Sequence, residues 1–535
     1  MDQRATMVPF VGGSFAYHAR FVSDQRTVNF YPETMPDGQN ARVPQLLAPT
    51  PGESIVGSWK CGEPCRALHW AATGPNGQPC LWGVFGSSVY RWTTIGGNVT
   101  PAKCTGSIVS GTGRVSIADN GYVLAIADGS TLWVVDLTAA DGALALVSAP
   151  LPSMAGATVR PSVVAYIASR FVINDANPGA QRNVFLFSNL NSQMPGQTGE
   201  IEFVIHGTTQ ANYYTAQYSA DAIDAIVVND GRLYVLGSSS YEIWAPGANA
   251  DTGDDPFDWV SGATAEIGTQ AAGSVAQIGD FVFWLGGSAS GRNGVYMSTG
   301  LKQPVRVSTN ALERKIANME ASSAAIGFCY TDEGHTFYCL TFDADGLTVV
   351  YDVSTQLWHE RSSRNWTTGE DGAWIPRYPV NGFGQRLFWG TDDGRLAELD
   401  HSHGRMIDAA TGLADKPAVR RRIGPVLWSA TNRVAVRDLA VDMEIGTTPE
   451  LAPETPGDLT PNSQNPRAML RVSRDGGYTW GNRNWRSFGR QGAYEKTVRW
   501  KNLGWGRSFV VELSFSEDFP FVVAGLRLGV EVLGA

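Results

Sequence analysis

The strongest constraint on the fold of this 535-residue chain is a repeated pattern of a short apolar run, a tight Gly/Asp/Ser turn and a second short apolar run. Each copy alternates β-branched or aromatic residues with small or polar ones around residues that tolerate turn dihedrals, which predicts a β-hairpin. The copies begin roughly 40 to 60 residues apart, a period typical of propeller blades. The sequence therefore predicts an all-β protein built around a β-propeller of six or seven blades. The seven copies lie at residues 81–92, 122–136, 170–187, 232–244, 281–297, 336–351 and 386–399.

Composition and charge support this interpretation and limit the possible functions. The chain has 60 Gly, 17 Trp, 17 Tyr and 22 Phe but only 17% charged residues, which suits half-buried sheets joined by many turns. A net charge of −10 argues against a protein that grips nucleic acid electrostatically, although not against one past which DNA slides. Six Cys are too few for a disulfide scaffold and are interpreted as buried, reduced thiols. Residues 1–20 lack a signal-peptide pattern and no apolar run is long enough to span a bilayer, so we expect a soluble, unexported protein.

The hairpin pattern divides the chain into three parts. Residues 1–52 contain no hairpin copy and are predicted to form an N-terminal arm, residues 53–405 the propeller, and residues 406–535 a C-terminal antiparallel β-sandwich-like domain. Strands of the last part are expected at 434–444, 468–473, 496–500, 508–515 and 522–532. A short helix is expected within 308–320. The Pro-rich segment 445–466 should be a long exposed loop, and its Pro449 and Pro456 are candidate partner contacts.

The sharpest local motif is an Asp-box of the pattern S-x-D-x-G-x-T-W. It comprises Ser473, Asp475, Gly477, Thr479 and Trp480. The Asp carboxylate is expected to accept hydrogen bonds from turn amides while the Trp packs beneath the hairpin, so the motif stabilises a β-turn. Sialidases carry several such boxes together with a catalytic cluster, and a single box outside the repeats indicates a structural role.

The basic run Arg420, Arg421 and Arg422 has two interpretations. It could contact phosphate or a partner, or it could be a solvated linker or a salt bridge to a neighbouring subunit beside Gly424 and Pro425. The sequence favours the second interpretation.

No motif indicates an enzyme. None of the seven Lys follows a Gly, which excludes a P-loop, and neither G-x-S-x-G nor G-x-G-x-x-G occurs. Paired carboxylates for glycoside hydrolysis stay open, because their separation depends on the fold. We therefore predict no catalytic, cofactor-binding or metal-binding residues. A carbohydrate-binding or glycoside-cleaving propeller is the alternative to a structural protein.

Four phrases in a fixed order give the chain a family resemblance. They are QRTVNFYPE at residues 25–33 followed by TPG at 50–52, GSSSYEIW at 237–244, GDFVFWL at 279–285, and VSTN at 307–310 before Leu312 and Glu313. In this order they resemble the packaged-DNA stabilisation proteins of short-tailed bacteriophages, the nozzle or hub component below the tail adaptor ring.

The resemblance implies a structural protein of the virion tail, assembled in the host cytoplasm. Such a protein would form a homohexameric ring, bind the adaptor ring, retain the packaged DNA and provide the conduit for genome ejection. It could also hold a tail needle or fibre. Double-stranded DNA would pass without sequence-specific binding, which agrees with the acidic balance of the chain.

Overall fold

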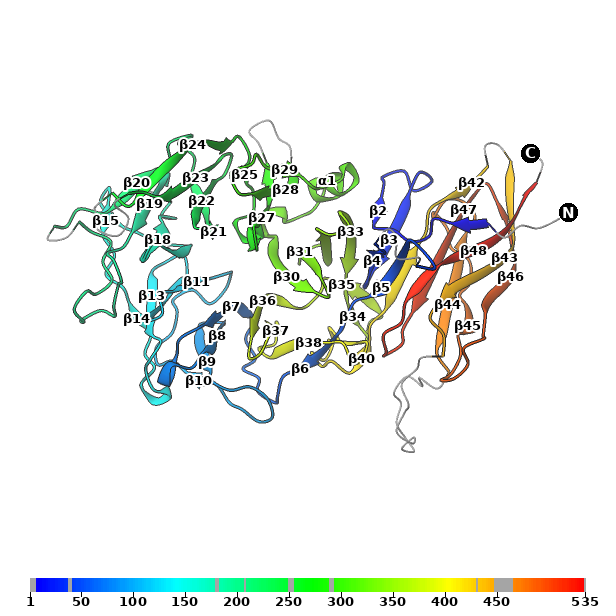
Figure 1. Cartoon of the computed structure of the whole chain (residues 1–535), viewed down its shortest axis with the longest axis horizontal. Helices are drawn as coiled ribbons and strands as arrows, with labels where there is room; N and C mark the ends of the chain where they lie inside the picture. Colours follow the sequence, from blue (N-terminus) through cyan, green and yellow to red (C-terminus); the bar gives the residue numbers. More distant parts are fainter. Residues whose placement is uncertain are drawn as a thin grey trace.

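A computed structural model describes residues 6–36, 41–178, 182–205, 208–248, 255–287, 293–429, 432–446 and 465–533. It contains a β-propeller and a β-sandwich that lie side by side (Figure 1). Pro449 and Pro456, the candidate partner contacts of the Pro-rich segment, lie outside the described residues.

The described residues form seven propeller blades, each containing at least four antiparallel strands. Blade 1 consists of β7 (Cys65–Ala71), β8 (Cys80–Phe85), β9 (Ser88–Trp92) and β10 (Ala102–Lys103). Blade 2 consists of β11 (Ser116–Asp119), β12 (Val123–Ala127), β13 (Leu132–Asp136) and β14 (Val147–Ser148). Blade 3 consists of β17 (Val164–Ile167), β18 (Arg170–Asn174), β19 (Val184–Phe187) and β20 (Tyr213–Thr215).

Blades 4 and 5 follow in the same way. Blade 4 consists of β21 (Ile223–Asn229), β22 (Arg232–Gly237), β23 (Tyr241–Pro246) and β24 (Phe257–Ala265). Blade 5 consists of β25 (Gly268–Thr269), β26 (Ala276–Ile278), β27 (Phe281–Gly287), β28 (Gly294–Thr299) and β29 (Val305–Arg306). Blade 6 is β30 (Ile326–Asp332), β31 (His335–Phe342), β32 (Leu347–Asp352) and β33 (Leu357–Arg361). Blade 7 is β36 (Arg377–Gly382), β37 (Arg386–Gly390), β38 (Leu396–Asp400) and β6 (Gly52–Ile55).

Each of the seven predicted hairpins is confirmed as an antiparallel strand pair inside one blade. Several central strands, such as β8 and β12, are buried along their whole length, because neighbouring blades cover both faces. The turn between β21 and β22 is formed by Asp230 and Gly231, both with positive φ, which matches the twist of a two-residue hairpin.

An early segment of the chain closes the propeller. β6 pairs with β38, so blade 7 combines strands from opposite ends of the propeller sequence. Its Glu53 is fully buried, and the carboxylate accepts hydrogen bonds from Trp374 Nε1 at 2.5 Å and Ile407 N at 3.0 Å. Burial raises the pKa of Glu53.

The segment predicted as an arm is built into the sandwich, so the expectation that it holds no hairpin was wrong. β4 (Phe30–Thr34) and β5 (Gln45–Pro49) form a hairpin, and β3 (Asp24–Val28) pairs with a C-terminal strand. The pattern is hidden because β3 is mostly polar and both β4 and β5 contain Pro, which normally marks a strand edge.

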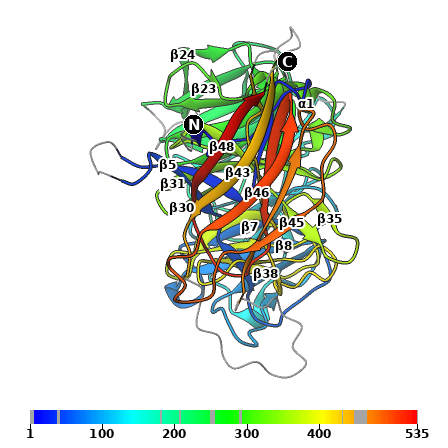
Figure 2. The same ribbon diagram turned by 90° about the vertical axis from the view of Figure 1, so that its right-hand side faces the viewer.

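The sandwich packs two sheets around one apolar core, and the sheet described first below faces the viewer in Figure 2. Each of the five predicted C-terminal strands overlaps an observed strand, although the strand expected at 496–500 runs from Val498 to Gly506. The first sheet runs β4, β5, β48 (Val523–Leu533), β43 (Arg433–Met443) and β46 (Val498–Gly506), with β1 (Thr6–Val8) against β48. The second runs β3, β41 (Arg420–Ile423), β47 (Ser508–Phe515), β44 (Arg467–Ser473) and β45 (Asn484–Ser487), with β2 (Phe15–Ala16) and β42 (Leu427–Trp428) at its sides.

The predicted helix is α1 (Asn310–Ala317), which buries Leu312 and Ile316 against blades 5 and 6. Thr309 caps it, because Leu312 N donates to its hydroxyl at 3.3 Å. Within the described ranges, no helix is both long enough and apolar enough to cross a bilayer. Short strand pairs decorate the loops: β15 (Ser153–Met154) with β16 (Ala157–Thr158), β34 (Ser363–Asn365) with β35 (Glu370–Gly372), and β39 (Arg405–Met406) with β40 (Lys416–Pro417).

Candidate functional site

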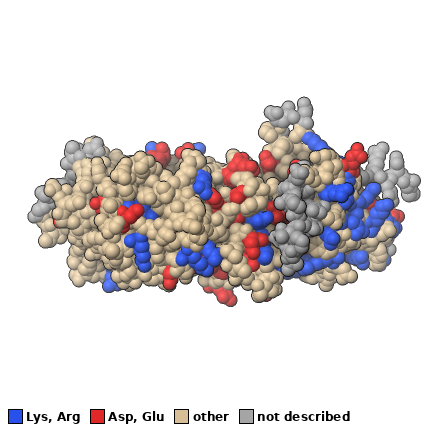
Figure 3. Space-filling view, turned by 90° about the horizontal axis from the view of Figure 1, so that it is seen from below, with Lys and Arg blue, Asp and Glu red and all other residues tan. Residues whose placement is uncertain are grey.

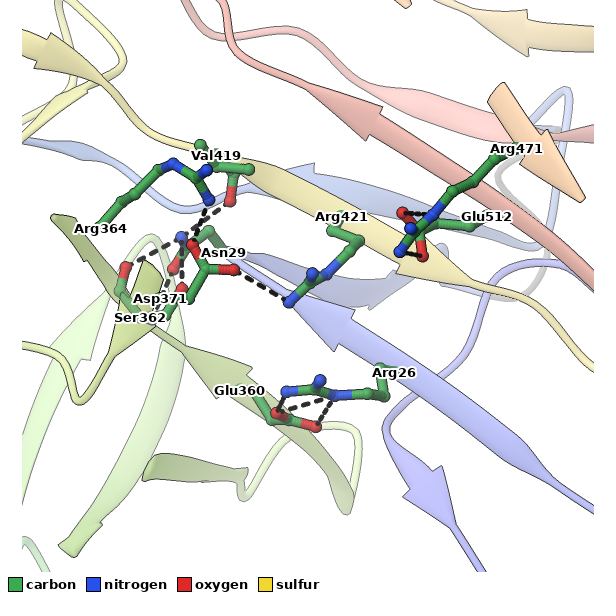
Figure 4. Close-up of polar contacts among 10 residues, drawn as sticks. All are labelled: Arg26, Asn29, Glu360, Ser362, Arg364, Asp371, Val419, Arg421, Arg471 and Glu512. Atoms are coloured by element: carbon green, nitrogen blue, oxygen red, sulfur yellow. Dashed lines mark hydrogen bonds and ion pairs between the residues drawn. The ribbon is translucent and has the colours of Figure 1, made fainter. Parts of the chain in front are cut away.

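The propeller and the sandwich are joined by a continuous sheet and a polar network (Figure 4). β33, the last strand of blade 6, pairs in parallel with β3 at Glu360 and Val28. β3 in turn pairs with β41 of the sandwich. We refer to this region as the junction. Backbone pairing therefore runs from blade 6 through β3 into the sandwich.

An ion pair spans the junction between Arg26 on β3 and Glu360 on β33. Arg26 Nε donates to both carboxylate oxygens of Glu360, at 3.1 and 3.2 Å, and a further contact comes from Nη2. Burial alone would raise the pKa of Glu360, but the Arg26 guanidinium outweighs it and holds that pKa below its usual value. Glu360 is therefore a buried, charged carboxylate that depends on Arg26.

Asn29 ties three segments of chain together beside this pair. Its side-chain amide donates to the carbonyl oxygens of Ser362 at 3.1 Å and Val419 at 3.0 Å, while its Oδ1 accepts from Ser362 N at 3.0 Å. The φ of Asn29 is +55°, a left-handed conformation that Asn tolerates better than most residues. This turn redirects the chain from the second sheet of the sandwich into the first.

The structure corrects the interpretation of the basic run for two of its members. Arg420 and Arg422 are fully buried rather than solvated or available to a partner. Arg420 donates to the carbonyl oxygens of Glu517, Phe519 and Thr50 at 3.1 to 3.3 Å. Sequence reasoning failed here because three consecutive charges suggest solvent, whereas alternation on a strand sends the first and third inward.

Arg422 holds the N-terminal segment. It donates to Phe10 O at 2.7 Å and Gly13 O at 3.0 Å, and its other donors reach the side chains of Thr27 and Gln25. A guanidinium has five donors in a fixed plane, so one side chain can satisfy several buried oxygens. Both arginines are therefore internal braces.

Arg421 points the other way and is half-buried. Its guanidinium lies 3.3 Å from Asp371, and Arg364 reaches the same carboxylate at 2.7 Å. The β34–β35 hairpin after blade 6 is thus attached to β41. Further into the sandwich, Arg471 and Glu512 form a bidentate pair at 2.9 and 2.8 Å.

The Asp-box occupies the connection between β44 and β45. Ser473 Oγ donates to Asp475 at 2.7 Å, and Thr479 N donates to Asp475 Oδ1 at 2.9 Å. Gly477 N donates to Ser473 Oγ at 2.8 Å, and half-buried Trp480 lies under the Arg471 guanidinium at 5.0 Å. Burial would raise the pKa of Asp475, but the hydrogen bonds from Thr479 outweigh it and lower the pKa to about 2.

The Asp-box turn also contacts the N-terminal segment. Gly476 lies against the backbone of Phe21, and Arg20 donates to Gly477 O at 3.3 Å. The motif therefore fastens the loop between β2 and β3 in addition to shaping its own turn.

A Ser, a His and an Asp meet near the closing strand, a constellation that the sequence did not indicate. Ser54 Oγ lies 3.0 Å from His403 Nε2 and donates to Asp400 Oδ2 at 2.8 Å. Arg405 N donates to His403 Nδ1 at 3.1 Å, so the neutral ring carries its proton on Nε2. Burial lowers the pKa of His403, which favours that neutral ring. A base whose facing nitrogen is already protonated cannot take the proton of Ser54, so the cluster lacks the arrangement of a hydrolase triad.

Three cavities lie among the inner strands of the propeller. The one with the greatest volume of these three, which we name the axial cavity, has a volume of about 390 Å³ and is lined by blades 1, 2, 5, 6 and 7. Arg114, just before β11, lines it and two smaller cavities. Arg114 Nη1 donates to Gly273 O at 2.9 Å and to Val275 O at 3.4 Å, so it bridges blades 2 and 5 across the axis.

The described residues contain no group of three or more His, Cys, Asp or Glu placed to hold a metal ion. All six Cys are free thiols; four are buried and two are half-buried.

Charge is divided unevenly between the two parts. Residues 420–535 contain 16 Lys and Arg against 12 Asp and Glu, whereas the whole chain contains 41 against 51. Figure 3 shows Lys and Arg gathered at the sandwich end, while the propeller face is mostly uncharged. Many of the sandwich charges are paired across strands, for example Arg499 with Asp438 at 2.6 Å.

Comparison with known proteins places both parts in one family. The family model described as "Bacteriophage P22 Gp10, beta-propeller" matches residues 75–404, and the model described as "Bacteriophage P22 Gp10, beta-sandwich" matches residues 420–531. No curated protein sequence matches the chain.

Solved structures give distant architectural likenesses alone. An exo-beta-1,3-galactanase from Phanerochaete chrysosporium has 10% identity and a TM-score of 0.28, covering 76% of this chain and 95% of its own. YCF48 bound to a D1 peptide has 11% identity and a TM-score of 0.37, covering 65% and 97%. The extracellular domain of BT3049 from B. thetaiotaomicron has 10% identity and a TM-score of 0.39, covering 89% and 59%. With propeller and sandwich both matched over most of its length, the chain belongs to the bacteriophage P22 Gp10 family, the packaged-DNA stabilisation proteins of phage tails.

Proposed function

We propose that this protein is the subunit of a tail nozzle, a homohexameric ring that docks below the adaptor ring, retains the packaged DNA and forms the conduit for its ejection. The observation that carries the proposal is the match of both propeller and sandwich to one family of phage structural proteins. A tail needle or fibre would bind at the distal end of the ring. Identical wedge-shaped bodies in heterologous contact close into a ring when the rotation permits it.

Two features of the molecule support a conduit between subunits rather than through one. Arg114 crosses the propeller axis, and cavities of a few hundred Å³ suit small molecules and not a DNA duplex. The junction network links the propeller to the sandwich by hydrogen bonds and an ion pair, which suits a ring that must resist the pressure of packaged DNA.

The proposal is tested by electron microscopy of the full chain, alone and mixed with its adaptor ring. We expect a six-fold ring with a central channel, seated coaxially on the adaptor. A protein that stays monomeric with the adaptor present would contradict the proposal, and cleavage of oligosaccharides by that monomer would support the glycosidase alternative.

DNA retention is tested separately with filled particles that lack this protein. We expect them to release nuclease-sensitive DNA, and we expect addition of the purified protein to reduce that release. Equal release with and without the protein would contradict a role in retention even if the ring forms.

A further inference from the structure

The axial cavity has the properties of a ligand site that ring assembly does not require. It lies on the propeller axis, and chain segments from five blades line it. Its volume of about 390 Å³ falls in the range of small-molecule sites. We propose that the axial cavity binds a carbohydrate, held by Asp392, Arg114 and Tyr378.

Tyr378 is held in a strained backbone conformation at the cavity wall. Its φ is +53°, which a bulky side chain adopts at a cost of about 1–3 kcal/mol. The strain coincides with an irregularity in the pairing of β36 with β37, between Arg377 and Val380. Burial raises the pKa of Tyr378 to about 12, so the phenol is neutral. Its ring packs against the apolar cluster between blades 7 and 1 and also lines the cavity, and its hydroxyl makes no hydrogen bond to any described residue.

Asp392 provides a free acceptor. It follows β37 and lines the cavity, yet its carboxylate has no hydrogen-bond or ion-pair partner in the described part of the chain. Burial raises its pKa, although Arg377 opposes the increase. The residue is nevertheless exposed, and an unpaired carboxylate at a cavity wall can accept hydrogen bonds from the hydroxyls of a ligand.

Arg114 provides free donors. Its two hydrogen bonds to backbone oxygens both come from Nη1, which leaves Nε and Nη2 for a ligand. The two other arginines of the cavity are already satisfied. Arg66 makes five hydrogen bonds within its own blade and the adjoining loop, and Arg377 is bound to Asp343 and to the carbonyl oxygens of Trp374 and Pro376.

The free groups together select the class of ligand. The wall carries three arginines against two aspartates, which disfavours a cationic ligand. The groups without partners, one carboxylate, one guanidinium edge and one neutral phenol, fit a ligand that both donates and accepts hydrogen bonds. Vicinal hydroxyls can donate to Asp392 and accept from Arg114, while the C–H face of a pyranose packs on the ring of Tyr378. A neutral sugar meets all three requirements.

The test uses the full chain and ligand-observed saturation-transfer NMR with D-galactose, D-mannose, L-rhamnose and N-acetyl-D-glucosamine. We expect saturable binding of at least one of these sugars with a dissociation constant of about 1 mM or tighter. Asp392→Ala should weaken that binding at least about tenfold. Asp280→Ala is the matched control, because Asp280 is also an exposed, unpartnered carboxylate among the described residues but lies away from the cavity.

A second variant tests whether the loss of sugar binding in Asp392→Ala is an indirect effect. Tyr378→Asn keeps a residue that tolerates the left-handed conformation, so the fold should survive while the stacking surface is lost and binding falls. The proposal is overturned if none of the four sugars binds saturably, if Asp392→Ala binds as tightly as wild type, or if zwitterionic glycine displaces the bound sugar.

Discussion

Buried arginines provide much of the contact between propeller, sandwich and N-terminal segment. Arg420 and Arg422 are surrounded mainly by carbonyl oxygens, whereas Arg26 depends on one carboxylate. The two situations differ in energy. A guanidinium among carbonyl groups satisfies loop ends that would otherwise be buried without partners, and a buried ion pair is tolerated only while both partners are present.

The first prediction concerns that ion pair. Arg26→Ala should lower the free energy of unfolding by about 2–4 kcal/mol, because Glu360 would be left charged and unpaired in the junction. Arg437→Ala is the control: Arg437 and Glu531 are both about half exposed, and its loss should change stability by less than about 1 kcal/mol. Denaturant unfolding measures both, and equal losses for the two variants would contradict the assignment.

The second prediction concerns pH. Burial raises the pKa of Glu517 to about 7, while Arg467 N donates to its carboxylate at 2.7 Å. The folded state therefore binds this proton more tightly than the unfolded state does. The stabilisation it provides is complete below about pH 4.5 and is lost as pH rises through about 7.

Glu517→Gln removes this dependence while keeping an oxygen that can accept from Arg467 N. Relative to wild type, the variant should gain stability between about pH 5 and 8, by up to about 3 kcal/mol. Denaturant unfolding at several pH values measures the difference, and a difference that stays constant with pH would refute the explanation.

At the scale of elements, the blades depend on close backbone approach as much as on apolar faces. A Cβ on Gly390 of β37 would lie 2.2 Å from the side chain of Cys65 on β7, so blade 7 contacts blade 1 where only Gly fits. The same ring closure relies on β6, which comes from before blade 1. Closure of the propeller is therefore sensitive to any side chain at this position.

The third prediction tests this closure. Gly390→Ala should lower the thermal midpoint by an amount equivalent to about 1–3 kcal/mol, because the blades must separate to admit the methyl group. Gly142→Ala is the control, since a Cβ there meets no atom within 4 Å. An effect of the same size in both variants would mean that backbone entropy, and not blade contact, is responsible.

The sequence predicted the blades well because each hairpin is local. Its two strands and its turn lie within about twenty residues, so alternation and turn chemistry are visible together. β3 and β6 could not be predicted in this way, because their partners β41 and β38 lie more than three hundred residues away. The junction could not be predicted for the same reason. Ser362 and Val419, which bond to the Asn29 side chain, and Glu360, which bonds to Arg26, are more than three hundred residues away in the sequence.

At the scale of the whole molecule, the sandwich is assembled from both ends of the chain. β3, β4 and β5 come from before the propeller, and β41 to β48 come from after it. Phe30 and Leu47 of the early strands belong to the same apolar core as Trp500 and Phe515. The propeller is thus inserted into the sandwich.

The fourth prediction follows from this insertion. A fragment of residues 403–533 should remain unfolded, because it lacks the five strands β1 to β5 and part of its core. The same fragment joined behind residues 6–51 by a flexible Gly/Ser linker should fold. Amide dispersion in NMR spectra distinguishes the two, and a dispersed spectrum from residues 403–533 alone would show that the early strands are dispensable.

The insertion also determines how a mechanical load would pass through the molecule. The propeller is attached by two covalent crossings, one after β5 and one before β41, and Asn29 bonds to both. Its carbonyl oxygen accepts from the Thr50 hydroxyl at 3.1 Å beside the first crossing, and its side-chain amide donates to Val419 O at 3.0 Å beside the second. Tension on the propeller is therefore shared between two parallel tethers, and neither can lengthen by unravelling from a chain end. A single linker of the same sequence would concentrate the whole load at one peptide segment.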